Sequence, residues 1–223
     1  MPKDVAAIRR CIRDFMDSAA ENGKQIGNSK FGVYAFYDYD EEPIYVGQTR
    51  ESLRQRIGRH LTNQRTDAVA MNVLDPFEVA EIEVWPLWDL EGKKSSNKEV
   101  AERLNGAEFT VFQKALKESV FGAVLNEKDM AKADEIELPR SHRARIIPDD
   151  LYEIREHPDV RIARRATTIA SLARVISERD VSKGLRRTLQ TQAKRLERLA
   201  SERLVQIHGE IPVAVPGEED KAE

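Results

Sequence analysis

Two short apolar runs around an acidic turn constrain the fold of this chain more than any other feature. The first run is FGVYAFYDY (31–39) and the second is PIYVG (43–47), with the acidic residues 40–42 between them. The first run is apolar on both of its alternating faces, so we expect a strand that is covered on both sides. The acidic turn and Pro43 favour a β-hairpin with a loop longer than two residues.

Each run carries a tyrosine close to a glycine, Tyr34 near Gly32 and Tyr45 near Gly47. A phenol in a tight hairpin can present its hydroxyl to a cleft, and a glycine allows a phosphate backbone to approach closely. Tyrosine also favours strands for structural reasons alone, so the hairpin by itself favours a tyrosine-rich core.

An amphipathic helix is predicted in QTRESLRQRIGRHLTNQR (48–65), with Thr49 placed to cap it. Its apolar stripe recurs every fourth residue, at Leu53, Ile57 and Leu61. Arg56 and His60 also stand four residues apart, so they share a face at the edge of this stripe. Taken singly, each is compatible with an ordinary surface side chain.

A third strand is predicted over residues 77–88, and a capping-box pattern at 96–99 predicts the start of a helix. Asn105 and Gly106 are expected to break that helix, so that a second one carries Glu108. Asn105-x-x-Glu108 also fits a capping box, in which the carboxylate only satisfies backbone donors. The alternative is that Glu108, at the edge of a buried face, meets a cation.

A short buried strand is predicted in GAVLN, ending at Asn126. Asparagine at this position also suits the start of a turn over 126–129. Two strands, two helices and a strand end therefore supply polar side chains that we expect around one pocket.

In this order, the motifs resemble those of the GIY-YIG nuclease family. GVY (32–34) and YVG (45–47) stand for its two signature tripeptides, and Arg56 with His60 for its Arg-x-x-x-His. The metal-binding glutamate of the family maps to Glu108 and its asparagine to Asn126. The resemblance covers roughly residues 31–126.

The resemblance implies an α+β fold: a small three-stranded antiparallel or mixed sheet flanked by helices. It also implies phosphodiester hydrolysis in DNA with one Mg²⁺ or Mn²⁺, held by Glu108. Tyr34 would be the general base, and Arg56 would contact the phosphate. The catalytic residues that the family implies are Tyr34, Tyr45, Arg56, His60, Glu108 and Asn126.

Charge distribution gives a second indication of nucleic-acid binding. The net charge is −3, which argues against a uniformly basic surface, but residues 50–65 hold five arginines and one acid. For the later arginines, a solvated face and a DNA contact are equally compatible with the sequence. The candidate DNA-binding residues are Arg50, Arg54, Arg59, Arg65, Arg143 and Arg145.

Composition excludes two other classes. A single cysteine, Cys11, rules out an internal disulfide framework and suits a reducing cytoplasm. No apolar run is long enough to cross a membrane, and the N-terminus lacks a signal-peptide core. We therefore expect a cytoplasmic protein with DNA, and no membrane, as its partner.

From Ser141 onward the pattern is helical, with helix starts at Pro148 and Pro158. Two long antiparallel helices are expected, separated by a turn over 181–184. They could fold back on the preceding domain, bind DNA, or pair with a second copy as a homodimer.

Four segments are therefore predicted. Residues 1–30 form an N-terminal helix and loop, 31–130 the nuclease domain, 131–210 a helical extension and 211–223 a disordered acidic tail.

Three functions fit this organisation. The first is a restriction or phage-defence endonuclease with a cognate methyltransferase as a functional partner. The second is a repair or mobile-element nicking nuclease, and the third is a degenerate nuclease fold that only binds nucleic acid.

Overall fold

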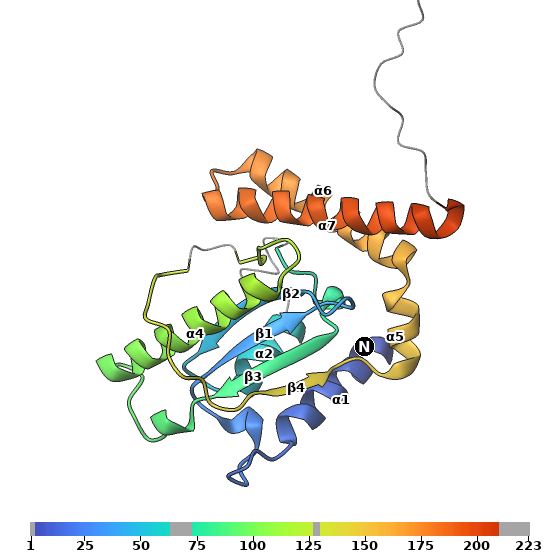
Figure 1. The fold of residues 1–223 in the computed structure, drawn as a ribbon. Helices are drawn as coiled ribbons and strands as arrows, with labels where there is room; N and C mark the ends of the chain where they lie inside the picture. The colour runs from blue at the N-terminus through green and yellow to red at the C-terminus, as the bar shows by residue number, and fades with distance from the viewer. Residues whose placement is uncertain (1–2, 63–72, 127–129, 210–223) are drawn as a thin grey trace, which may run out of the picture.

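The computed structural model describes residues 3–62, 73–126 and 130–209, and its centre is a four-stranded antiparallel sheet (Figure 1). The strand order is β2-β1-β3-β4. The strands are β1 (Gly32–Tyr37), β2 (Pro43–Thr49), β3 (Glu81–Pro86) and β4 (His142–Arg145). Every residue of β1 is buried, as its apolar alternation predicts, and β2 is an edge strand. The predicted α+β class and hairpin are confirmed.

Helices cover both faces of the sheet. On one face lie α1 (Lys3–Asp17) and α2 (Leu53–Thr62), and the other face is covered by α4 (Lys98–Glu118). Tyr34 and Phe36 belong to the core on the α2 face, whereas Val33 and Val46 belong to the core under α4. The alternation of β1 and β2 therefore sends Tyr34 and Tyr45 to one face and the valines beside them to the other.

The prediction of three strands is wrong by one, because β4 falls where a helical pattern was expected. Its sequence HRAR has no apolar alternation that would indicate a strand. Instead Arg143 pairs with Glu81 of β3 and its guanidinium lies over the Tyr37 ring, so polar contacts hold this edge. The third strand is also shorter than predicted, since short 3-10 helices at Pro76–Glu78 and Trp88–Leu90 flank β3.

Three predicted boundaries differ in the structure. The predicted break at Asn105 and Gly106 is absent, because α4 is continuous; a Cβ on Gly106 would lie 3.0 Å from Ile136, so glycine makes room for that chain segment. Residues 123–126 are not a strand, although Leu125 donates its backbone N–H to Ile44 beside β2. Thr49 ends β2 instead of capping α2, and the Ser52 hydroxyl accepts the bond from the Gln55 N–H.

The C-terminal part contains α5 (Asp149–Glu156), α6 (Pro158–Glu178) and α7 (Lys183–His208). The predicted helix starts and the turn before α7 are confirmed. Helices α6 and α7 pack against each other and lie across the end of the sheet that carries the β1–β2 turn (Figure 1). Leu172 and Leu185 join the same core as Tyr34, so this extension folds back on the preceding part of the chain. None of the described helices is long and apolar enough to span a membrane.

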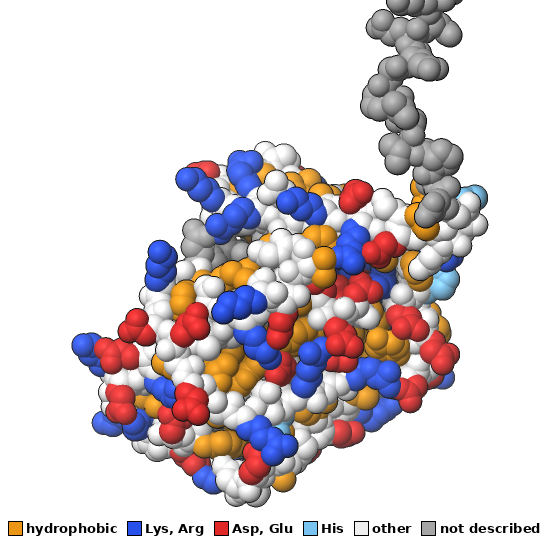
Figure 2. Space-filling view, viewed as in Figure 1, with side chains coloured by type: hydrophobic (Ala, Val, Ile, Leu, Met, Phe, Trp, Pro, Cys, Tyr) orange, Lys and Arg blue, Asp and Glu red, His pale blue; other side chains and the backbone are white. Residues whose placement is uncertain are grey.

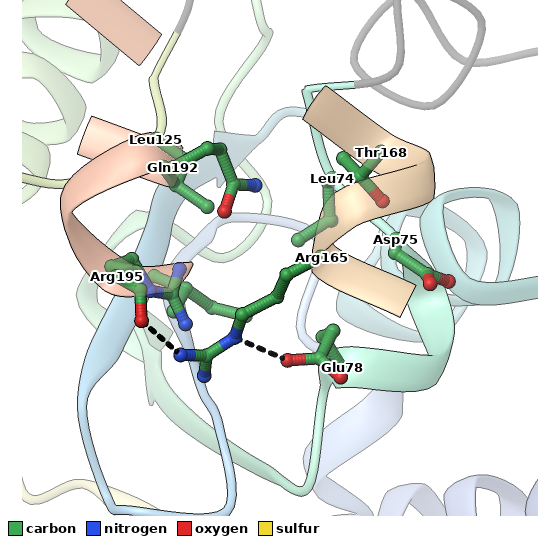
Figure 3. Close-up of a pocket in the computed structure, with 9 residues that line it drawn as sticks. Leu74, Asp75, Glu78, Leu125, Arg165, Thr168, Gln192 and Arg195 are labelled. Carbon is green, nitrogen blue, oxygen red and sulfur yellow. Dashed lines mark hydrogen bonds and ion pairs between the residues drawn. The ribbon is translucent and has the colours of Figure 1, made fainter. Parts of the chain in front are cut away.

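A buried charge cluster fixes the C-terminal helices to the β1–β2 turn. The Asp38 side chain is 2% exposed and accepts hydrogen bonds from three guanidinium groups, which belong to Arg161, Arg165 and Arg195. Arg165 also donates to Glu78 and to the carbonyl of Arg195, beside the small cavity of Figure 3. Asp38 is thus bonded to arginines more than 120 positions away in the chain.

Candidate active site

Tyr34 and Arg56 form the first polar contact of the site. Leu53 and Ile57 are fully buried and hold α2 on the sheet, which directs Arg56 toward β1. The Arg56 Nε donates to the Tyr34 Oη over 3.1 Å. Burial raises the pKa of Tyr34 to about 12, whereas Arg56 acts in the opposite direction by favouring the phenolate.

Gly47 provides the space that the Tyr34 hydroxyl occupies. The two residues are partners across the β1–β2 ladder. A Cβ on Gly47 would lie 2.5 Å from the Tyr34 Oη, a distance at which one of the two groups would have to move. A glycine at this position therefore lets the phenol cross the edge strand.

Glu108 approaches the same edge strand from the other face of the sheet. It lies in the middle of α4, half-buried, and its Oε2 accepts a hydrogen bond of 2.9 Å from the Gln48 Nε2. Burial raises the pKa of Glu108, while Gln48 and the positive charges of Arg56 and Arg50 limit that rise. Because α4 is continuous, the capping-box interpretation of Glu108 is wrong.

His60 and Tyr45 complete an aromatic group around Tyr34. The His60 ring centroid lies 5.3 Å from that of Tyr45 and 5.8 Å from that of Tyr34. Both ring nitrogens of His60 are buried without a hydrogen-bond partner among the described residues. Burial, followed by the charges of Arg56 and Arg59, lowers the pKa of His60 to about 3, so the ring is neutral at physiological pH.

Asn126 binds the backbone of β2 and not the other polar side chains. Its Nδ2 donates to the Val46 carbonyl (2.7 Å), and its Oδ1 accepts from the Val46 N–H (3.2 Å). These two bonds hold the outer edge of β2 between Tyr45 and Gly47. The alternative of a turn over 126–129 falls partly outside the described residues.

The candidate DNA-binding arginines are distributed unequally around this site. Arg50 is exposed, and its charge acts on Glu108. Arg54 donates to the Met16 carbonyl and to Asp17, and Arg59 pairs with Glu51. Arg143 and Arg145 lie on β4, at the opposite edge of the sheet from β2, and Arg65 lies outside the described residues.

Gln48 is the site residue that the sequence analysis missed. It follows Gly47 directly and shares the α4 side of β2 with Val46, so strand alternation already places it toward Glu108. Its Nε2 also donates to Asn105 (3.1 Å), whereas its Oε1 is buried without a partner among the described residues.

The oxygen atoms beside Glu108 fit a hard cation. In the described part of the chain, no group of three or more His, Cys, Asp or Glu residues is placed to hold a metal ion. A carboxylate beside an unpartnered amide oxygen instead suits Mg²⁺, which binds few protein ligands and retains water. In this small α+β fold, a phenol, a guanidinium and a carboxylate therefore lie at one edge strand.

Comparison with known proteins gives one family match. Residues 30–91 match the model of the GIY-YIG catalytic domain, which supports assignment of this segment to the GIY-YIG nuclease family. The matched segment contains Tyr34, Tyr45, Arg56 and His60 and ends before Glu108 and Asn126. Comparisons with curated proteins and with solved structures gave no match.

Proposed function

We propose that this nuclease is a Mg²⁺-dependent DNA endonuclease of the restriction or phage-defence type. The observation that carries the proposal is that two neighbouring residues of β2 bring these groups together: Tyr34, bonded to Arg56, lies against Gly47 on one face of the sheet, and Glu108 is bonded to Gln48 on the other. The charge of Glu108 raises the pKa of Tyr34, and that of Arg56 lowers the pKa of Glu108, so the three groups act on one another. Hydrolysis of a phosphodiester needs such groups around a single phosphate.

Each residue has a proposed role. Glu108 would hold the cation, with the Gln48 Oε1 beside it, and Arg56 would place a forked cationic donor on the phosphate. A bound Mg²⁺ or Mn²⁺ would supply positive charge to the phosphate and to the leaving oxygen. Tyr34 would accept the proton of the attacking water in its ionised form, after its own proton has passed to solvent, and the Arg56 hydrogen bond favours this phenolate.

The other polar residues would position these groups. Tyr45 and the neutral His60 would orient the water or share the proton transfer. With a pKa of about 3, the His60 ring is neutral at neutral pH, so one of its two nitrogens is free to accept a hydrogen bond. Asn126 would fix β2 and thereby Tyr45 and Gly47, through its two bonds to Val46.

The substitution Glu108→Gln tests the proposal. With plasmid DNA and Mg²⁺, we expect the wild-type protein to cleave and the variant to lose at least about a thousandfold in rate, roughly 4 kcal/mol. Binding of DNA in EDTA should be retained. Glu102→Gln, on the exposed side of the same helix, is the matched control and should cleave normally.

The products of the same reaction separate the candidate functions. Discrete fragments support the restriction type, for which we also propose a homodimer on a two-fold site and a cognate methyltransferase as functional partner. Nicked circles indicate the repair or mobile-element type, and intact DNA indicates a binding module. Cleavage by Glu108→Gln at the wild-type rate would contradict the role of Glu108.

A further inference from the structure

The first half of α7 presents a stripe of basic side chains to the solvent. We define the α7 stripe as Lys183, Arg186, Arg187 and Lys194, all of which are exposed. At about 100° per residue, these four positions fall within an arc of about 100° on the helix. The stripe extends over eleven residue steps, which is about 16 Å at 1.5 Å per residue.

The charge of the stripe is not balanced within its own helix. No Asp or Glu occurs between Lys183 and Leu196. The second half of α7 is different, because there Arg198 pairs with Glu202, one turn away. Figure 2 shows basic side chains gathered over the end of the α6–α7 pair where the two helices are joined. Within α7, the positive charge is therefore concentrated in the first half of the helix.

The buried side of the same helix places the stripe near the active site. Leu185 belongs to the core that contains Tyr34 and Tyr45. Gln192 donates to the Val73 carbonyl and lines the small cavity of Figure 3 together with Ile44 and Leu125, the residues next to Tyr45 and Asn126. The packing that buries one face of α7 thus directs its basic face outward beside the end of β2.

We infer that the α7 stripe binds the phosphate backbone of duplex DNA next to the scissile bond. The inference rests on the proposed function, because it supplies that active site with a second contact to its substrate. B-DNA carries one negative charge per about 1.7 Å of its axis, so a stripe of about 16 Å can face several phosphates. Such contacts fix the position of DNA without reading its sequence.

The salt dependence of binding tests the inference. Lys183→Gln, Arg186→Gln and Lys194→Gln are combined with Glu108→Gln, and binding to a duplex is measured by fluorescence anisotropy in EDTA. If each of the three residues contacts a phosphate, the slope of log K against log salt should fall by about 2.7. Between 50 and 200 mM salt, Glu108→Gln alone should then lose about 40-fold more affinity than the quadruple variant.

A control variant removes three positive charges from a surface outside the α7 stripe. Lys3→Gln, Arg10→Gln and Arg13→Gln change three exposed residues of α1, again with Glu108→Gln. This control should bind DNA with the unreduced slope, and thermal unfolding should show both multiple variants folded.

Two results would overturn the inference. One is an unchanged slope in the stripe variant while the wild-type protein cleaves DNA, which leaves the proposed function intact. The other is an equal loss in both multiple variants, which would indicate an effect of net charge alone. If the wild-type protein neither binds nor cleaves DNA, the proposed function itself has failed, and the inference fails with it.

Discussion

The protein contains two clusters of acids, arginines and aromatic rings, and they differ in how their charges are balanced. Under α6 and α7, three carboxylates face three guanidinium groups, and the residues are Asp38, Asp40, Glu78, Arg161, Arg165 and Arg195. At the edge of β2, Glu108 is bonded to a neutral amide, and Arg56 is bonded to a phenol. In the first arrangement every carboxylate has a guanidinium partner, whereas in the second no guanidinium among the described residues is bonded to Glu108, as the proposed cation site requires.

The largest expected effect is on the free energy of unfolding, and it distinguishes the two clusters. Asp38→Asn leaves three buried arginines with one carboxylate fewer, so we expect the free energy of unfolding to fall by about 3–5 kcal/mol. Glu108→Gln should change it by no more than about 1 kcal/mol, because burial already disfavours the ionised form of Glu108. Urea unfolding measures both. The control is Glu41→Gln, at an exposed position of the same turn as Asp38. If Asp38→Asn and Glu108→Gln lower the free energy of unfolding equally, the two clusters do not differ in their effect on stability.

The substitution Gln48→Ala should have an intermediate effect, on the rate of cleavage. The variant should lose about 10–100-fold in cleavage, as is typical when a residue that orients a metal ligand is removed. Because the Gln48 hydrogen bond favours the ionised carboxylate, the pKa of Glu108 should rise in the variant, which carbon NMR of labelled glutamate can measure. Gln55→Ala, at an exposed position of α2, should change neither quantity. An unchanged Glu108 titration would show that Gln48 does not act on this carboxylate.

The smallest effect concerns the pH dependence of stability through His60. Its pKa falls from 6.5 to about 3 on folding, so between these values the unfolded chain binds a proton that the folded chain does not. Stability should therefore decrease as the pH is lowered from 6.5, by at most about 1.4 kcal/mol per pH unit. His60→Gln should reduce this slope in unfolding experiments at pH 5 to 6.5. His208→Gln, at the exposed end of α7, should retain it, and parallel curves for wild type and His60→Gln would contradict the prediction.

The sequence predicts the helices and strands that are specified by residues close together in the chain. The hairpin, α2, α6 and α7 follow from apolar periodicity and turn residues, and the order of the site residues follows from family motifs. The sequence misses β4, since HRAR has no strand pattern and its pairing depends on Glu81. It also predicts a break at Gly106, where the distant Ile136 instead needs the space left by a missing side chain.

The partners of the arginines are the main information that the sequence lacks. Arg161, Arg165 and Arg195 occur in helices whose other arginines are exposed or half-buried, and nothing near them in the chain indicates full burial. Only the fold brings them to Asp38, more than 120 residues away. The same limit applies to Gln48, whose role depends on where α4 places Glu108.

The two bonds from Asn126 to Val46 have a consequence for assembly. An edge strand normally offers its free N–H and C=O groups to any strand of another molecule. Here a side-chain amide occupies those of Val46 in the manner of a peptide group, and the Leu125 N–H occupies the Ile44 carbonyl. A second copy therefore cannot pair with β2 at Ile44 and Val46 without displacing these groups, and the proposed symmetric dimer would be joined through other surfaces.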